Sequence, residues 1–295
     1  MELLNNESLY SKMPLCYPFI KWAGGKTQLL PKLYAFVPAE FNRYFEPFLG
    51  GGAMFFYLIS VKNKRFTSYL SDINSELINS YAVVKYNVEK LIDVLKVCEI
   101  KYKKSQSEYY YKLRANTIAA PDIERAARFI TLNRTCYNGL YRVNRLGVFN
   151  VPWGKYKDPV ICNSKNLRNV SLVLRLSKAA IKICDYKKIL LGKAKEGDFI
   201  YLDPPYNPTS STAYFTKYTN TGFNYKDQEE LAAVFRKLDD RKCKILLSNS
   251  DTYFIKELYS DFAEYITEVD AVRAINSKGS KRAGHKELII RNYSR

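Results

Sequence analysis

The feature that most constrains the fold is an apolar run at residues 198–202 that leads into two consecutive prolines, Pro204 and Pro205. A short apolar run of this kind is typical of a buried strand. Proline has no backbone N–H and restricts the residue before it, so the pair ends any strand or helix. Asp203, the two prolines and Tyr206 are therefore predicted to form a rigid turn at the carboxyl end of a strand, where ligands bind in open α/β sheets.

This turn offers hydrogen-bond acceptors and an aromatic face to a planar ligand. The Asp203 carboxylate and the Pro204 carbonyl can each accept one N–H of an exocyclic amine such as adenine N6, which favours a more tetrahedral nitrogen with a usable lone pair. Tyr206 offers a ring for base stacking, worth about 1–3 kcal/mol, and a base of a duplex must first leave the stack. The alternative is a proline-rich turn with an aspartate cap, which is the commoner explanation of such a sequence.

The charge of the chain indicates a polyanionic partner. The 295 residues carry 47 Lys and Arg against 29 Asp and Glu, a formal net charge of +18, and include 25 Tyr and 16 Phe. An excess of this size, with so many rings available for stacking, suits nucleic acid. The alternative is a basic, tyrosine-rich protein from a lysine-rich proteome.

Several classes of protein are disfavoured by the composition. The six cysteines are scattered without a CxxC pair, and there is one histidine, His285, so no metal site is expected. Free thiols indicate a cytoplasmic protein. Residues 1–15 do not resemble a secretory signal, and no stretch approaches the roughly 20 apolar residues of a membrane span.

Two glycine-rich segments precede predicted helices. Gly24 and Gly25 are followed by Lys26, but a phosphate-binding loop would need a glycine where Ile20 stands. Residues 44–59 read as a short strand, a turn at residues 50–52 and an apolar helix, which is the first βα unit of a nucleotide-binding sheet.

Asp72 ends a second predicted strand, about 20 residues after the glycine turn, which is the spacing of an acidic residue that binds ribose hydroxyls. The alternative role for Asp72 is to cap the next helix.

The middle of the chain reads as an inserted, basic, mostly helical region. Residues 76–129 have a helical pattern, with Pro121 separating two helices. A probable β-hairpin follows, with its turn at residues 144–147 between Arg142 and Arg145. A two-stranded ribbon fits the DNA major groove, and arginine reads guanine O6 and N7.

The remaining pattern returns to a sheet. Helices are expected at residues 169–183 and 227–238. Strands are expected at residues 180–186, 244–251 and 287–292, the last closing the sheet, and residues 276–286 read as a basic loop suited to phosphates.

The order of these motifs resembles a known family. Residues 21–26 (Lys-Trp-Ala-Gly-Gly-Lys), 45–52 (Phe-Glu-Pro-Phe-Leu-Gly-Gly-Gly), 71–74 (Ser-Asp-Ile-Asn), 133–152 and 203–206 (Asp-Pro-Pro-Tyr) occur as in the Dam-type DNA adenine-N6 methyltransferases, which use S-adenosylmethionine. The resemblance spans about residues 18–292. It implies a Rossmann-like catalytic, cofactor-binding domain at residues 1–76 and 177–295 and a target-recognition domain at residues 77–176.

The resemblance also implies roles for single residues. Asp203, Pro204 and Tyr206 would hold the flipped adenine, so that methyl transfer to N6 is direct and leaves S-adenosylhomocysteine. The residues expected to hold the cofactor are Trp22, Ala23, Lys26, Phe48, Gly50 and Gly52 for its methionine part, Asp72 for its ribose, and Asp185 with Tyr186 for its adenine.

The DNA contacts implied by the resemblance lie mostly in the recognition region. Tyr137 resembles the residue that wedges into the base stack, and Asn138 one that stabilises the opened pair. Base-edge contacts within GATC are implied for Lys21, Leu140, Arg142 and Pro152, with Arg142 reading a guanine.

The family includes solitary enzymes and partners of restriction endonucleases that act independently, so double-stranded DNA is the expected substrate in a prokaryotic or phage-type, nucleoid-associated protein. Two rival functions are an amino methyltransferase acting on cytosine N4 or RNA, and a non-enzymatic DNA-binding protein. Asp203 at the start of its tetrapeptide, where the cytosine enzymes have serine, argues against the first. The intact Asp72, Asp203 and glycine turn argue against the second.

Overall fold

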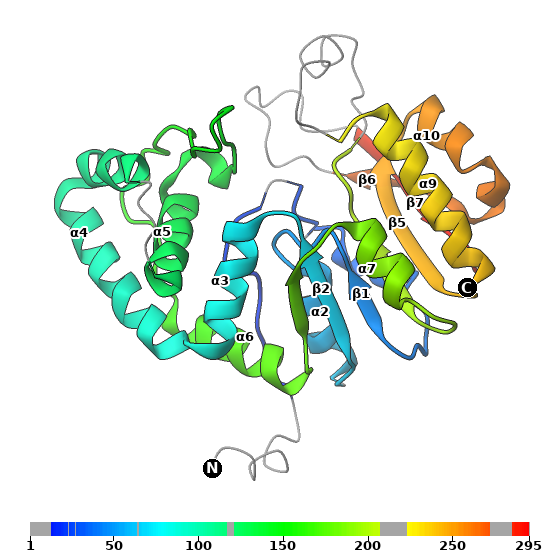
Figure 1. The fold of residues 1–295 in the computed structure, drawn as a ribbon, viewed down its shortest axis with the longest axis horizontal. Coiled ribbons are helices and arrows are strands. Elements are labelled where there is room, and N and C mark those ends of the chain that lie inside the picture. Colours follow the sequence, from blue (N-terminus) through cyan, green and yellow to red (C-terminus); the bar gives the residue numbers. More distant parts are fainter. Residues whose placement is uncertain are drawn as a thin grey trace. The chain divides into compact units, whose positions relative to one another are not determined.

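The computed structural model describes residues 13–22, 24–26, 28–63, 65–116, 121–206, 223–271 and 285–294 (Figure 1). The chain forms two compact units. The first contains Met1–Gly25, Gly50–Arg65 and Asn74–Ile183, and the second contains Lys26–Leu49, Phe66–Ile73 and Cys184–Arg295. The predicted mixed α/β fold is confirmed.

The first unit is mostly helical. Its elements are α2 (Ala53–Lys62), α3 (Ser75–Tyr86), α4 (Val88–Ala115), α5 (Asp122–Thr135), the 3-10 turn η2 (Tyr137–Gly139), α6 (Ser164–Leu176) and the strand β3 (Ala180–Ile183).

Helix boundaries in this unit differ from the predicted ones because asparagines cap or interrupt helices. Three helices, not two, occupy residues 75–135, since Asn87 leaves the helical conformation between α3 and α4. The helix predicted at residues 169–183 is α6 instead. It begins earlier because the Asn163 side chain accepts the Asn166 N–H, and it ends before Lys178, whose φ of 50° is left-handed.

The second unit contains a sheet whose strands lie in the order β2-β1-β4-β5-β7-β6. Strands β1 (Tyr44–Glu46), β2 (Ser68–Asp72), β4 (Phe199–Leu202) and β5 (Lys244–Ser250) are parallel, whereas β7 (His285–Arg291) runs antiparallel to both β5 and β6 (Ile266–Ala271). The prediction that residues 287–292 close the sheet is wrong, because β7 lies between β5 and β6. Strand β6 was not predicted.

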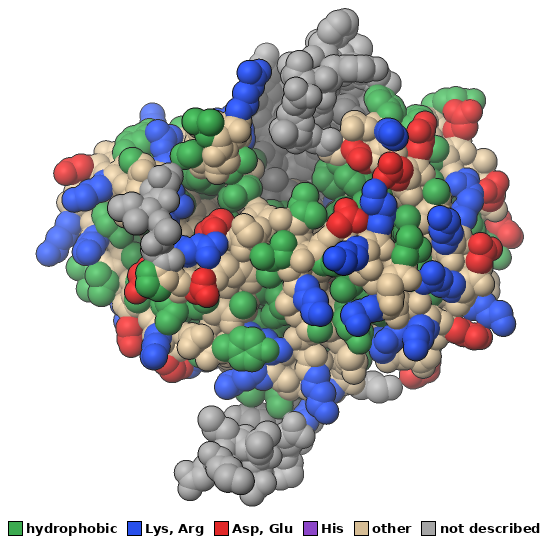
Figure 2. Space-filling model, in the orientation of Figure 1, with side chains coloured by type: hydrophobic (Ala, Val, Ile, Leu, Met, Phe, Trp, Pro, Cys, Tyr) green, Lys and Arg blue, Asp and Glu red, His purple; other side chains and the backbone are tan. Residues whose placement is uncertain are grey.

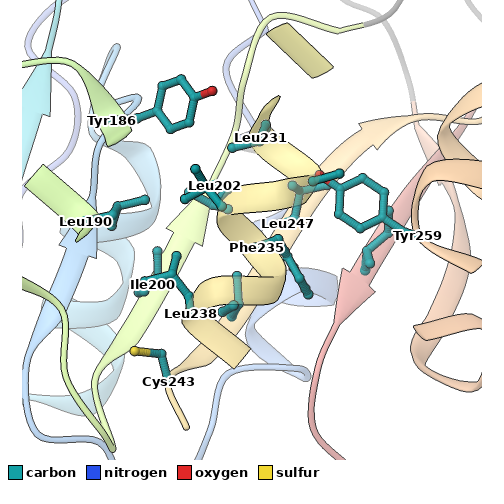
Figure 3. Close-up of a cluster of buried hydrophobic side chains, with 14 of the residues drawn as sticks. Tyr186, Leu190, Ile200, Leu202, Leu231, Phe235, Leu238, Cys243, Leu247 and Tyr259 are labelled. Atoms are coloured by element: carbon teal, nitrogen blue, oxygen red, sulfur yellow. The ribbon is translucent and has the colours of Figure 1, made fainter. Parts of the chain in front are cut away.

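The helices of the second unit are α1 (Leu30–Tyr34), α7 (Tyr186–Lys193), α9 (Tyr225–Asp240), α10 (Tyr253–Leu258) and the 3-10 helix η3 (Ser260–Tyr265). Side chains of α7, α9, α10 and η3 pack on this sheet. Figure 3 shows Leu190 of α7 and Phe235 of α9 beside Ile200 and Leu202 of β4, in a cluster of buried side chains. This apolar contact holds β4, and so fixes where its carboxyl end lies.

The helix α9 is well defined at its start by a capping box. The Asn224 side chain accepts the N–H groups of Lys226 and Asp227, and the Asp227 carboxylate accepts the Asn224 N–H. Such reciprocal bonds satisfy N–H groups that a helix leaves without partners.

None of the helices within the described ranges is both long and apolar enough to cross a membrane.

Candidate active site

The predicted strand before Asp203 is confirmed, because β4 ends at Leu202. Residues 203–206 follow without regular secondary structure and are called the Asp203 turn below. The Asp203 carboxylate is held through one oxygen. Ser248 of β5 donates its hydroxyl to Asp203 Oδ1 at 3.0 Å, and Lys26 Nζ lies 3.2 Å from the same atom. No hydrogen bond between described residues reaches Asp203 Oδ2. Since the side chain is 23% exposed, the carboxylate is fixed in place while one oxygen can still accept a hydrogen bond from a ligand.

The Tyr206 side chain is held by one contact to its hydroxyl and one to its ring. Its hydroxyl donates to Glu287 Oε2 at 2.8 Å, and Lys26 Nζ lies 4.2 Å from the ring centroid. Burial raises the pKa of the Tyr206 phenol well above its ordinary value, and the negative charges of Asp203 and Glu287 add to this shift. The hydroxyl therefore remains a protonated donor at neutral pH.

The carbonyl of Pro205 is held by a relay of buried amides. Gln228 of α9 donates to Pro205 O at 2.9 Å, and Asn249 of β5 donates to Gln228 Oε1 at 3.0 Å. Gln228 and Asn249 are 1% and 0% exposed. Buried amide groups are normally hydrogen-bonded. The two hydrogen bonds of this pair therefore provide partners for its buried polar atoms and also fix the turn.

Four residues that support the turn were not assigned to the site from the sequence: Gln228, Ser248, Asn249 and Glu287. The only signal for two of them was the run of polar residues at the end of the strand predicted at residues 244–251. Glu287 gave a weaker signal, as an acid directly before the apolar residues 288–290.

Within the second unit, several residues predicted to bind the cofactor lie together. The rings of Phe48 and Tyr186 stack with centroids 5.2 Å apart. The Asp72 carbonyl accepts the N–H of Cys184, the residue before Asp185. The structure thus brings the end of β2 beside the start of α7.

The two acidic residues differ in their local roles. Asp185 Oδ1 accepts the Lys187 N–H and caps α7, a role that the sequence analysis did not foresee. Asp72 does not cap the helix that follows it, because Asn74 accepts the Leu77 N–H at the start of α3. The capping alternative for Asp72 is therefore wrong.

Trp22 and two glycines, predicted to bind the cofactor, lie in the first unit, while Ala23 lies outside the described residues. The Trp22 ring stacks on the Tyr141 ring, with the two centroids 5.8 Å apart. A Cβ on Gly50, whose φ is +46°, would lie 2.6 Å from Trp22 Cδ1, so only glycine allows this approach. Gly52 has a φ of 65° and precedes α2.

Predicted DNA contacts of the first unit are joined by Asn133, a residue not assigned to the site from the sequence. Its side chain accepts the Lys21 N–H at 2.8 Å and donates to the carbonyls of Lys21 and Gly139. The Tyr137 N–H donates to the Pro152 carbonyl at 2.9 Å. Lys21, the 3-10 turn and Pro152 therefore form one local constellation.

Other members of this constellation are placed as follows. Asn138 has a left-handed φ of 53°, and Leu140 is half-buried against the small core around Tyr110. The Lys21 ammonium lies 4.2 Å from the Tyr156 ring centroid, and burial and the charge of Arg134 lower the pKa of Lys21.

The predicted β-hairpin is present as a turn with two isolated antiparallel bridges, between Val143 and Phe149 and between Cys136 and Trp153, and these described residues form no longer ladder. The Asn144 side chain accepts the N–H groups of Leu146 and Val148, as its turn chemistry suggested. Arg142 donates through Nε to Asn150 Oδ1 at 2.7 Å, and its side chain is exposed.

Positive charge is widely distributed over the protein. Figure 2 shows Lys and Arg side chains across the visible surface of each unit, with Asp and Glu among them. No group of three or more His, Cys, Asp or Glu side chains in the described parts of the chain is arranged to hold a metal ion.

Comparison with known proteins identifies the family of this chain. The profile of the D12 class N6 adenine-specific DNA methyltransferases matches residues 22–275. A type II methyltransferase of Methanocaldococcus jannaschii, M.MjaIII, is 44% identical over 94% of this chain and 99% of its own length. The type II methyltransferase M1.LlaDCHI of Lactococcus lactis subsp. cremoris is 41% identical over 94% of this chain and 95% of its own.

A DNA adenine methylase of Escherichia coli K12 is 33% identical over 92% of this chain and 93% of its own length. The resemblance inferred from the motifs is therefore confirmed. With a profile that matches most of its length and relatives more than 40% identical over 94% of it, the chain belongs to the D12 class of N6 adenine-specific DNA methyltransferases.

Proposed function

We propose that this enzyme transfers a methyl group from S-adenosylmethionine to N6 of an adenine flipped out of duplex DNA, within the sequence GATC. The observation that carries the proposal is the state of Asp203. Its Oδ1 is anchored by Ser248 and Lys26, and its Oδ2 accepts no hydrogen bond from the described residues. Oδ2 can therefore accept a hydrogen bond from the substrate.

The proposed target site uses the whole turn. Asp203 Oδ2 accepts one N–H of the adenine amino group, and the Pro204 carbonyl accepts the other. This pair of acceptors directs the nitrogen lone pair away from them, and orientation of this kind can lower a barrier by about 7–11 kcal/mol. Tyr206 offers its ring face to the base.

The chain also carries groups that suit S-adenosylmethionine, which when bound supplies an electrophilic methyl group. Asp72 and Asp185 are acceptors suited to ribose hydroxyls and an adenine amine, and the stacked Phe48 and Tyr186 supply aromatic surface. For the methionine part we propose Trp22, Ala23, Lys26, Gly50 and Gly52, on the resemblance.

DNA recognition is proposed for residues 77–176 together with Lys21. Tyr137, which is 44% exposed, would enter the base stack, and Asn138 would support the opened pair. Base-edge contacts are proposed for Lys21, Leu140, Arg142 and Pro152, and the exposed Arg142 guanidinium would read a guanine.

A cognate restriction endonuclease is a further proposed companion, since two relatives are named type II methyltransferases. It would act independently on the same DNA sequence. The family match to adenine-specific enzymes disfavours the cytosine-N4 rival.

The test is transfer of labelled methyl from S-adenosylmethionine to matched duplexes with and without GATC, followed by nucleoside analysis. We expect label in N6-methyladenine only in the GATC duplex. Label in N6-methyladenine at another sequence would overturn the GATC assignment and keep the reaction. Absence of label on any DNA would overturn the proposed reaction.

A further inference from the structure

Glu287 is a buried acid beside the candidate active site that the proposed function does not yet use. It is the third residue of β7, where it pairs with Ser250 of β5 and Val269 of β6. It is 6% exposed. A buried carboxylate is costly unless it is paired and hydrogen-bonded, so its partners need an account.

Its two partners both belong to the candidate active site. Glu287 Oε2 accepts the Tyr206 hydroxyl at 2.8 Å and lies 3.6 Å from Lys26 Nζ. The same ammonium lies 3.2 Å from Asp203 Oδ1. Lys26 therefore bridges two carboxylates, one that is proposed to contact the substrate and one that is not.

Removing Glu287 would change both partners. The Tyr206 hydroxyl would lose its acceptor, so the ring would lose one of the contacts that set its orientation. The Lys26 ammonium would lose one of the two carboxylates that lie near it among the described residues, so it would be drawn more strongly to Asp203, where it would compete with the substrate amine.

We propose that Glu287 is a positioning residue for the target base. It holds the Tyr206 ring at the angle needed for stacking, and it shares the Lys26 ammonium with Asp203 so that Asp203 Oδ2 stays available to the adenine amine. This inference rests on the roles proposed above for Asp203 and Tyr206.

The first experiment compares Glu287→Ala and Glu287→Gln with the parent enzyme in methyl transfer to the GATC duplex. A misplacement of about 1 Å can cost about 100-fold in rate. We expect Glu287→Ala to lower kcat by about 10- to 100-fold, while the KM for S-adenosylmethionine changes little. Glu287→Gln keeps an acceptor for the Tyr206 hydroxyl and should recover part of the loss.

The matched control is Glu268→Gln on the neighbouring strand β6. Glu268 pairs with Lys256 and Lys286 on the surface, so this variant removes an acid of the same type away from the turn. It should keep the parent kcat. Melting temperatures of all variants separate a loss of folded protein from a loss of rate per folded molecule.

A double-mutant cycle with Tyr206→Phe tests the route of the effect. The phenylalanine keeps the ring and removes the hydroxyl. If Glu287 acts largely through that hydroxyl, Tyr206→Phe/Glu287→Ala should lose little more activity than Glu287→Ala alone, because residues in contact do not add independently. Losses that multiply would overturn this route.

The outcomes separate this inference from the proposed function. A parent enzyme that methylates DNA, with Glu287→Ala and Glu287→Gln both at the parent kcat, would overturn the positioning role alone. A folded Glu287→Gln with a reduced kcat supports the role even if Glu287→Ala does not fold. A parent enzyme that transfers no methyl to DNA would overturn the proposed function, and this inference with it.

Discussion

Two turns in this protein are built in opposite ways. The turn at Asp203 and Tyr206 is held by residues far away in the sequence: Ser248 is 45 residues and Glu287 is 81 residues from its partner. The hydrogen bonds of the turn between Arg142 and Asn150 span no more than eight residues, and its arginine is exposed. The first turn is fixed by the fold of the second unit, whereas the hydrogen bonds of the second turn are local.

This difference matches two different demands. A carboxylate that must meet one amine needs a fixed position, and buried long-range contacts provide it. A surface that reads bases can change side chains without disturbing a core, because local turn chemistry keeps its backbone in place. The proposed chemistry should thus be sensitive to distant residues, whereas the proposed sequence choice should depend on the exposed side chains themselves.

The largest effect is expected at Asp203. Asp203→Ala removes the acceptor for the amine and should lower the methyl-transfer rate by about 1,000-fold or more. Single-turnover transfer would measure the rate, and calorimetric titration with S-adenosylmethionine should show nearly unchanged cofactor affinity. Turnover near that of the parent would refute the role of Asp203.

The relay behind the turn should show a smaller effect, on both stability and rate. Gln228→Leu leaves the Pro205 carbonyl and the Asn249 amide without their partner, at a cost of about 1–3 kcal/mol in the free energy of unfolding. Denaturant unfolding would measure that cost, and kcat should fall with it.

Gln106→Leu is the matched control for this relay. Gln106 of α4 also donates to a carbonyl, that of Lys157, but this hydrogen bond is exposed, so water can replace it. If both variants lower the free energy of unfolding equally, burial of the Gln228 relay does not add to its contribution to stability.

At the exposed turn, the expected change is in sequence choice. Arg142→Ala should reduce discrimination at one base pair of the site by about 1–3 kcal/mol. Methylation of duplexes that differ from GATC at single positions would measure it, with Arg145→Ala as the control on the same turn. Arg145→Ala should weaken all duplexes alike, so a selective loss there instead would transfer the reading role.

The smallest effect is expected for an ion cluster that belongs to neither turn. Hydrogen bonds and charge from Lys256 and Lys286 lower the pKa of Glu268 from 4.5 to about 2 in the folded protein. This cluster therefore stabilises the fold above pH 4.5, and its contribution is lost as the pH falls toward 2.

Because Glu268 is on the surface, solvent screening keeps this contribution small. Glu268→Gln should remove it, so the gap between the unfolding midpoints of parent and variant should narrow as the pH falls from 6 to 2.5. A gap that is independent of pH would exclude the linkage.

The sequence predicted the parts of the fold that depend on neighbouring residues. The strand before Asp203, its proline turn and the turn at Asn144 all follow from local chemistry, and the structure contains them. Boundaries were less predictable where an asparagine competes with the helix, as Asn87 and Asn163 do.

The support of the site could not be predicted because it depends on the order of strands. Ser248 reaches Asp203 because β5 pairs with β4, and Glu287 reaches Tyr206 because β7 pairs with β5 in the opposite direction. Nothing in the residues around Glu287 specifies that neighbour. The residue types of the turn are therefore set by the local sequence, whereas its rigidity depends on the order of strands in the sheet.

The double proline has a consequence for which purine can be accepted. Neither Pro204 nor Pro205 has a backbone N–H, and the Asp203 carboxylate has only lone pairs, so the two prolines and the Asp203 side chain offer acceptors alone. Hypoxanthine, which carries a 6-oxo group in place of the amine, would bring its own lone pairs against theirs. If the proposed function holds, the turn should select adenine over hypoxanthine, because only adenine donates hydrogen bonds from its 6-position.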